Sequence, residues 1–247
     1  MRKEVSQLDP GVLEPYLKAR VDGFRGPVTI EKFAGGQSNP TIRLTTPTGD
    51  YVLRRQPPGE LLKSAQAVDR EYRVLRALEG SAVPVAKALH LCEDRDVIGS
   101  MFYIMEYCDG RIFWNAALPE LDRDDRGAVY AEMIRILAEL HQVDYGAVGL
   151  GDFGKPGNYF ERQYKRWSEQ YRASELRRID HMEALINWLG EHLPEDDGRV
   201  ALVHGDYRLD NMIFSHDAPR AIAVLDWELS TLGHPFADVG YLCMQLR

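Results

Sequence analysis

The segment VHGDYRLDNMIF, from Val203 to Phe214, has apolar residues at both ends and a polar centre. Its ends belong to the apolar runs ALV and MIF, and the β-prone run AIAVLDW follows at residues 221–227. Short β-prone runs separated by polar residues predict strands joined by a loop. We therefore expect two short strands that face each other across a loop carrying His204, Asp206 and Asn211.

The polar residues of this loop form an ordered set with a later aspartate. His204-Gly205-Asp206 is followed by four residues and then by Asn211, and Asp226 comes after the next hydrophobic run. An HGD triplet alone is also an ordinary turn in which the aspartate is a cap. The complete set is similar to the catalytic loop and metal-binding aspartate of the aminoglycoside phosphotransferase (APH) and choline kinase family, whose members are relatives of protein kinases.

The resemblance implies a phosphotransferase that uses ATP and Mg²⁺. Phosphoryl transfer needs a carboxylate beside the attacking hydroxyl group and oxygen ligands for the Mg²⁺ that bridges the phosphates. In this interpretation Asp206 is the catalytic residue, which orients the hydroxyl and accepts its proton. Asn211 and Asp226 are expected to hold the metal. His204 is expected to brace the loop rather than to take part in the chemistry.

The residues up to Tyr107 predict a small α+β lobe. Asp9 and Pro10 are typical of a helix start. A helical pattern between residues 62 and 78 ends near Gly80. Five β-prone runs surround it, namely VTIEKF (28–33), TIRLTT (41–46), YVLRRQ (51–56), VAKALHLC (85–92) and MFYIMEY (101–107). We therefore expect a five-stranded antiparallel sheet with one helix inserted after its third strand.

The residues after Tyr107 predict a mainly helical lobe. Apolar residues share one face of a first long helix, namely Tyr130, Met133, Ile134, Leu137 and Leu140. Phe160, Tyr164, Trp167 and Tyr171 form a stripe on a second, and we expect Trp167 and Tyr171 to be core residues. The final segment, ADVGYLCMQLR, reads as a helix start without a stop signal, so we expect this lobe to be incomplete. The predicted fold is two-lobed and protein-kinase-like, with a nucleotide-binding lobe at 1–107 and a catalytic lobe at 108–247.

The third strand and the inserted helix carry a candidate ion pair. Strand alternation puts Val52 and Arg54 on one face. Arg54 stands where related kinases carry a phosphate-binding lysine, and an arginine keeps the charge and can bind phosphate in a bidentate manner. Glu71, in DREYRVLRAL, matches the glutamate that pairs with this cation in the family. On its own, Glu71 also fits a solvated helix charge.

Two further segments are expected to contact ATP. The loop between the first two strands offers backbone amides to the phosphates through Gly35, Gly36, Ser38 and Asn39. A plain hairpin turn explains these residues equally well. The backbone of Glu106 and Cys108 is placed by the resemblance where the chain passes between the lobes, so that it can bind adenine. As sequence alone, this segment is also simply the end of a buried strand.

The segment after Asp226 resembles small-molecule kinases more than protein kinases. Trp227-Glu228 follows the aspartate in place of Phe-Gly, and no APE-like segment comes later, so protein substrates are disfavoured. Glu228 is either a residue that reaches a second metal or a surface acid. Asp238 resembles the family aspartate that caps a helix and steadies the catalytic loop.

The acceptor is suggested by a narrower resemblance. GLGDFGKPGN and YFERQYKRWSEQY are similar to the phosphotransferase domains that are fused to or associated with acyl-CoA dehydrogenases. This implies a hydroxyacyl-CoA-like acceptor and a functional link to such a dehydrogenase. The alternatives are an aminoglycoside, choline or homoserine kinase, or a nucleotide-binding pseudokinase or regulatory module. Arg162, Lys165 and Arg166 either meet an anionic substrate or form a solvated basic face.

Composition excludes several other classes. The 247 residues carry a formal net charge of −8, which argues against nucleic acid or an anionic membrane as the main partner. The three cysteines are widely spaced, so a disulfide framework or a zinc site is not expected. The N-terminus lacks the continuous apolar segment of a signal peptide, and no run is long enough to span a bilayer. We expect a soluble, cytoplasmic protein.

Overall fold

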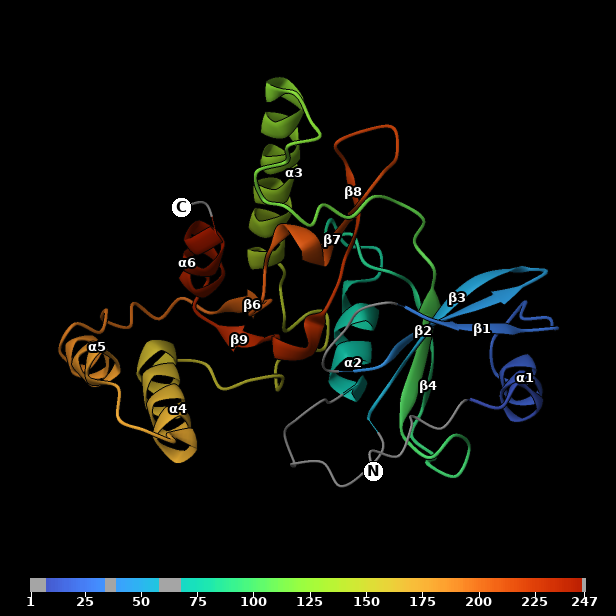
Figure 1. The fold of residues 1–247 in the computed structure, drawn as a ribbon, viewed down its shortest axis with the longest axis horizontal. Coiled ribbons are helices and arrows are strands. Elements are labelled where there is room, and N and C mark those ends of the chain that lie inside the picture. The colour runs from blue at the N-terminus through green and yellow to red at the C-terminus, as the bar shows by residue number, and fades with distance from the viewer. Residues whose placement is uncertain (1–7, 34–38, 58–67, 246–247) are drawn as a thin grey trace.

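The computed structural model describes residues 8–33, 39–57 and 68–245. Figure 1 shows the sheet-containing part on the right and the helical part on the left. The elements up to Tyr107 are α1 (Pro10–Lys18), β1 (Thr29–Lys32), β2 (Thr41–Thr46), β3 (Gly49–Arg55), α2 (Val68–Leu78), β4 (Ala88–Cys92) and β5 (Phe102–Glu106). The later helices are α3 (Arg123–His141), α4 (Tyr159–Ser174), α5 (Asp180–Glu191) and α6 (Phe236–Gln245), and the later strands are β6 (Ala201–Val203), β7 (Met212–Phe214), β8 (Ala221–Val224) and β9 (Thr231–Gly233). Single 3₁₀ turns, η1 (Leu209–Asn211) and η2 (Trp227–Leu229), separate these strands.

The first five strands form the antiparallel sheet that the sequence predicted. Their order is β1-β2-β3-β5-β4, so β3 lies at the centre with β5 beside it. The helix α2 comes between β3 and β4 in the chain, as expected, and its described part begins at Val68. Leu62 and Ala65, which belong to the predicted helical pattern, lie outside the described residues.

Strand alternation gives the two faces of this sheet different neighbours. Leu53 and Ile104 point to one face, where they pack with Leu13 and Leu17 of α1. Val52 belongs to the other face, which packs against α2. Arg54 shares the face of Val52 and therefore points toward α2. The alternation expected at β3 is confirmed, and it brings a cation to the helix that carries Glu71.

The core under α2 continues without a break into the second half of the chain. One cluster of buried side chains joins Val74 of α2 to Met133 of α3 and Tyr207 of the polar loop. Two short antiparallel ribbons, β6–β9 and β7–β8, lie within this region. The helix expected at the chain's end is present as α6. In the described part of the chain, no helix is both long and apolar enough to cross a membrane.

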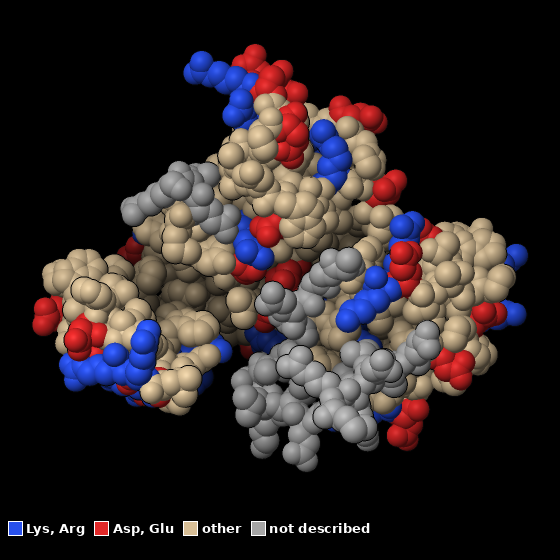
Figure 2. Space-filling view, in the orientation of Figure 1, with Lys and Arg blue, Asp and Glu red and all other residues tan. Residues whose placement is uncertain are grey.

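The helices α4 and α5 form a separate pair at one end of the molecule (Figure 1). Ser168 is the buried residue of α4, and Trp167 is 51% exposed. The expectation that Trp167 and Tyr171 lie in the core is therefore wrong for Trp167, and Tyr171 is only half-buried. Helical spacing predicts which residues share a face, but the contacts of α4 cover this face only in part: Tyr164 lies against Gly190 of α5, whereas Trp167 stays exposed. Figure 2 shows a hollow between this pair and the rest of the molecule.

Candidate active site

The polar loop from His204 to Asn211 is anchored by the ribbons on both sides. It leaves β6 at Val203 and enters β7 at Met212, which pairs with Val224 of β8. Beyond this pair, the Leu225 backbone N–H donates to the Asn211 carbonyl at 2.8 Å. Asn211 and Asp226 therefore flank the open end of the β7–β8 hairpin, and their sharing of a metal ion stays a prediction.

Asp206 and Asn211 are in direct contact. The Asn211 Nδ2 donates to both the carbonyl and the Oδ2 of Asp206, each at 2.9 Å. The Tyr241 hydroxyl, from α6, also donates to the Asp206 carboxylate, and this contact is the main reason why the pKa of Tyr241 is raised. Arg208 lies 3.5 Å from the same carboxylate and 3.2 Å from Asp210. The Asp206 carboxylate is thus held in one orientation by three neighbours.

The loop is braced from below by Asp238, which is fully buried. Its two carboxylate oxygens accept the backbone N–H groups of His204 at 2.9 Å and Gly205 at 2.8 Å. His141 Nε2 lies 3.0 Å from the same carboxylate. The His204 Nε2 contacts the Leu225 carbonyl at 2.8 Å, and burial lowers the pKa of His204. His204 therefore links the loop to the segment that precedes Asp226, and its role is structural.

Asp226 has a backbone conformation that is uncommon for its residue type. Its φ and ψ are 66° and 57°, in the left-handed region. A non-glycine residue held there costs about 1–3 kcal/mol, and such positions cluster at functional sites. Asp226 lies between β8 and η2, and its side chain contacts Arg54 of β3.

Arg54 contacts three carboxylates. Its Nε lies 3.0 Å from Glu71 Oε2, and its Nη2 lies 3.7 Å from Glu228 Oε2. Nη2 also donates to Asp226 Oδ1. The expected pairing of Arg54 with Glu71 is present, and a second nitrogen of the same guanidinium contacts Asp226, which follows β8 in the chain.

The other side of Glu71 is held by two groups. The Tyr103 hydroxyl donates to Glu71 Oε2 at 3.0 Å, and Asn39 Nδ2 donates to Oε1 at 2.8 Å. Asn39 Nδ2 also lies 3.4 Å from Glu228 Oε2, and the Asn39 Oδ1 is buried without a hydrogen-bond partner in the described structure. Asn39 therefore links the start of β2 to α2 and to η2.

The charges in this cluster shift the pKa values of its members. Burial raises the pKa of Glu71 to about 7, against the opposing effect of the Arg54 charge and with the help of Asp226 and Glu228. Burial alone would lower the pKa of Arg54, but Glu71, Tyr103 and Asp226 raise it above its usual range, so Arg54 stays charged. One arginine facing three carboxylates leaves a local excess of negative charge, which favours a further cation nearby.

The donor set fits Mg²⁺ with a bound phosphate. Because Asn211 uses its Nδ2 toward Asp206, its amide oxygen is the atom left for a cation, and Asp226 has a second carboxylate oxygen beyond the one that meets Arg54. Among the described residues, no group of three or more His, Cys, Asp or Glu side chains is arranged to hold a metal. Mg²⁺ is commonly bound by one or two protein carboxylates plus substrate phosphates and water, which agrees with this sparse set.

The segment expected to bind adenine continues directly from β5. The Glu106 N–H donates to the Lys87 carbonyl at 3.0 Å, and the Glu106 carboxylate accepts the Lys87 N–H at 3.0 Å. Glu106 is thus engaged by its own sheet neighbour. Cys108 is half-buried, and burial raises the pKa of its thiol to about 11. Contact of either residue with adenine stays a prediction.

Sequence reasoning located most of these residues and missed two. Tyr103 carries no local signal, because its place beside Arg54 follows from the β3–β5 register, which the sequence pattern does not give. Tyr241 offered no signal, since its approach to Asp206 depends on where α6 packs. Three of the predicted nucleotide-binding residues, Gly35, Gly36 and Ser38, lie outside the described residues.

Comparison with known proteins identifies the family to which the chain is similar. The family model for the phosphotransferase enzyme family (APH) matches residues 29–247. Acyl-CoA dehydrogenase family member 10 from Mus musculus is 48% identical over 233 residues, which are 94% of this chain and 22% of that protein. The chain therefore spans about a fifth of this curated relative's length.

Solved structures share the fold. A Ralstonia eutropha protein assigned provisionally to the aminoglycoside phosphotransferases is 51% identical, with a TM-score of 0.86 over 96% of this chain and 70% of that chain. The streptomycin–ATP–APH(2″)-IIa ternary complex is 19% identical, with a TM-score of 0.65 over 94% of this chain and 74% of that chain. The second likeness bears on the fold alone. The kinase-like, mixed α+β fold expected from the sequence is confirmed.

Proposed function

The chain belongs to the phosphotransferase enzyme family, and on that premise we propose that it transfers the γ-phosphoryl group of ATP to a hydroxyl group of a small molecule. The observation that carries this proposal is the contact between Asp206 and Asn211 at the end of the hairpin that also presents Asp226. A base, an amide oxygen and a carboxylate then converge from one short segment of chain. This is the arrangement that phosphoryl transfer needs.

In the proposed reaction, Asp206 orients the acceptor hydroxyl and takes its proton as the oxygen bonds to the γ-phosphorus. The bond to the bridging oxygen breaks, and ADP leaves. Asn211 and Asp226 would hold Mg²⁺, which neutralises the charge that develops on the phosphates. Arg54 would contact the phosphates from β3, with Glu71 fixing its orientation.

ATP is proposed to lie between the sheet and the catalytic loop. Its phosphates would meet the backbone at Gly35, Gly36, Ser38 and Asn39, and its adenine the backbone of Glu106 and Cys108. We place the boundary between the nucleotide-binding and catalytic lobes after Tyr107, giving lobes at 1–107 and 108–247. One fold neighbour was solved as a ternary complex with streptomycin and ATP, which supports this donor.

We propose a hydroxyacyl-CoA-like acceptor and a functional link to an acyl-CoA dehydrogenase. The support is the 48% identity with a protein named as an acyl-CoA dehydrogenase family member. Neither nucleic acid nor a membrane is proposed as a partner, because the chain carries a formal net charge of −8. The cytoplasm is the compartment that we propose.

A second candidate is a pseudokinase that binds nucleotide without turnover. The observation in its favour is the contact of Arg54 with Asp226, which engages the candidate metal aspartate with a protein cation. In this case nucleotide would bind while Arg54 keeps part of its contact with Asp226, so that Asp226 does not become a metal ligand. Turnover separates the two candidates.

The test is a set of acceptors assayed with ATP and Mg²⁺, including a hydroxyacyl-CoA, kanamycin, choline and homoserine. We expect transfer to the hydroxyacyl-CoA, and Asp206→Asn should lower kcat about a hundredfold or more while ATP still binds. Asp210→Asn is the matched control, since Asp210 lies in the same loop and pairs with Arg208. ATP binding with no transfer to any acceptor would favour the pseudokinase. An unchanged rate in Asp206→Asn would refute the assignment of the base.

A further inference from the structure

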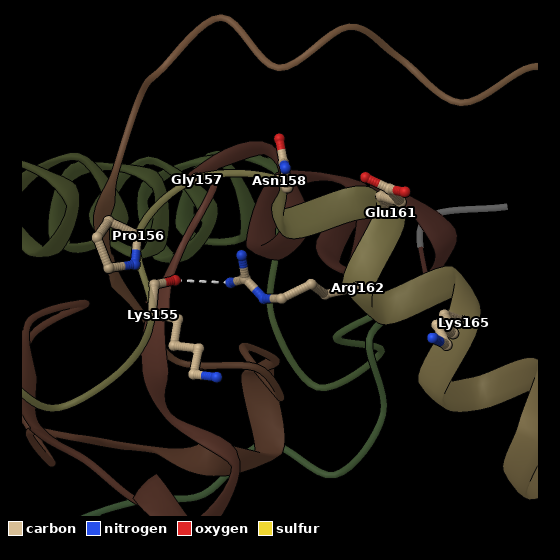
Figure 3. A pocket seen from close by; sticks show the side chains of 7 residues that line it. All are labelled: Lys155, Pro156, Gly157, Asn158, Glu161, Arg162 and Lys165. Carbon is tan, nitrogen blue, oxygen red and sulfur yellow. Dashed lines mark hydrogen bonds between the residues drawn. The ribbon is translucent and has the colours of Figure 1, made fainter.

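A pocket opens at the start of α4, away from the residues assigned to the transfer reaction. Its volume is about 380 Å³, and it is lined by Lys155, Pro156, Gly157, Asn158, Glu161, Arg162 and Lys165. Figure 3 shows Lys155 entering from the preceding loop, while Arg162 and Lys165 come from successive turns of α4. Three cations from two segments of chain therefore surround one opening.

These cations have no carboxylate partners. Within the described residues, no ion pair is formed by Lys155, Arg162 or Lys165, whereas Arg172 near the end of α4 pairs with Glu183 at 3.7 Å. In a chain with a formal net charge of −8, the lining of this opening still carries three cations against one acid. Figure 2 shows basic side chains over the end of the molecule that α4 and α5 form.

The pocket is also partly preorganised. The Arg162 guanidinium donates to the Lys155 carbonyl at 2.6 Å, which ties the loop to the helix. Glu161 is the one acid in the lining, and in Figure 3 its carboxylate points to the opposite side from Lys155. The backbone N–H of Asn158 already donates to Asp196, so the attraction for an anion comes from the side chains and not from the helix end.

The start of α4, where the pocket opens, is connected to the segment that carries Asp206 through β9 and β6. Tyr159, the first residue of α4, lies so close to Gly233 of β9 that a Cβ there would be 2.5 Å from its ring. Gly233 pairs with Ala201 of β6, and Asp206 is five residues beyond Ala201. Five residues span at most about 18 Å even when fully extended, so Asp206 lies within that reach of the β6–β9 pair against which α4 begins.

We propose that this pocket binds phosphate groups of the acceptor, at the far end of a molecule whose hydroxyl group lies at Asp206. The inference rests on the proposed function and deepens it, because a coenzyme A thioester carries its phosphates on one end of a long flexible arm and its acyl group on the other. Arginine and lysine side chains form charge-assisted hydrogen bonds with phosphate oxygens. The ATP phosphates belong to the separate site at Arg54.

The test measures binding and transfer separately. Coenzyme A, dephospho-coenzyme A, inorganic phosphate and ATP are titrated calorimetrically into the chain and into two variants, Lys165→Gln and Arg162→Gln/Lys165→Gln. Arg177→Gln is the control, since Arg177 is an exposed arginine just beyond α4 and loses the same charge. Melting temperatures verify that each variant is folded, and Lys165→Gln keeps the Arg162 contact with the loop.

We expect the double variant to weaken coenzyme A binding about tenfold or more, and Lys165→Gln to weaken it by a smaller factor. The affinity for ATP should stay within about twofold, and Arg177→Gln should behave as the unmodified chain. Weaker binding of dephospho-coenzyme A than of coenzyme A would identify the terminal phosphate as the bound group. Tighter binding of inorganic phosphate than of coenzyme A would overturn the proposal, because it would indicate a general anion site.

Two further outcomes distinguish this inference from the function on which it rests. If coenzyme A binds and depends on Arg162 and Lys165 while no acceptor is phosphorylated, the site stands and the proposed reaction fails. If a hydroxyacyl-CoA is phosphorylated in an Asp206-dependent manner and its KM is the same in Lys165→Gln and in the double variant, the reaction stands and the site fails. No binding of coenzyme A to the unmodified chain would also overturn the site.

Discussion

Arg54 of β3 donates to Asp226, which lies 172 residues later in the chain, immediately after β8. The same guanidinium contacts Glu71 of α2, so one side chain ties the sheet, the inserted helix and the catalytic ribbon together. Arginine suits this role because its planar fork presents several N–H groups in different directions. A lysine has a single nitrogen to divide between the two carboxylates.

Arg54→Gln should be strongly destabilising. Above about pH 7, where Glu71 is ionised, removing the cation leaves this buried carboxylate without its charged partner, and breaking a buried ion pair in this way costs about 3–5 kcal/mol. Arg54→Lys should keep most of the stability and raise the KM for ATP. Urea unfolding gives the free energies. Arg43→Gln is the control, because Arg43 pairs with Asp50 near the surface, where losing an ion pair changes the free energy of unfolding little. Equal losses at both positions would contradict the role given to Arg54.

Glu71 should make stability depend on pH. Its pKa is raised by burial from 4.5 to about 7 in the folded chain, so the folded state holds a proton that the unfolded state has released between these values. The contribution of Glu71 is therefore complete below pH 4.5 and is lost as pH rises through about 7, with a slope of at most about 1.4 kcal/mol per pH unit. The difference in unfolding free energy between the unmodified chain and Glu71→Gln isolates it. We expect the unmodified chain to lose stability relative to Glu71→Gln as pH rises in this range. A gain of stability relative to Glu71→Gln would show that the pKa of Glu71 is lowered and not raised.

The pattern of the sequence predicted the strands for a local reason, whereas the pairing of Arg54 with Glu71 was expected from the family resemblance. Alternation puts Val52 and Arg54 on one face, whatever the rest of the fold does. The contact between Tyr103 and Glu71 depends on β3 pairing with β5, which requires two segments about fifty residues apart to meet in one register. The left-handed backbone of Asp226 also had no sequence signal, because aspartate is only one of several residue types that tolerate this conformation and nothing local singles out Asp226.

The helical stripe of α4 illustrates a different limit. Periodicity correctly predicted a helix. It also assigned Trp167 to the core, but this residue is 51% exposed in the structure. An apolar face identifies residues that can be covered and carries no information about what covers them.

Gly205→Ala should damage the loop at its start. Gly205 has a φ of 84°, and a Cβ there would lie 2.7 Å from the Leu229 carbonyl oxygen. The left-handed conformation alone costs about 1–2 kcal/mol for a residue with a Cβ, and the contact with a backbone oxygen adds to it. Gly127→Ala is the opposite case, because Gly127 lies in α3 with open space around it and should gain up to about 1 kcal/mol. Thermal unfolding compares the two, and similar shifts would contradict this account.

Asp238→Asn tests whether the brace beneath the loop controls the reaction. The two carboxylate oxygens of Asp238 accept the backbone N–H groups of His204 and Gly205, and an asparagine offers only one oxygen for the two donors. One buried N–H then faces an NH₂ group, which costs about 1–3 kcal/mol. We expect this loss in urea unfolding, faster hydrogen exchange at one of the two amides, and a lower kcat with little change in the KM for ATP, since Asp206 follows directly. Asp217→Asn, an exposed aspartate on the β7–β8 connection, should change none of these quantities. If exchange at both amides stayed slow while kcat fell, the effect of Asp238 on the reaction would have to pass through His141 instead.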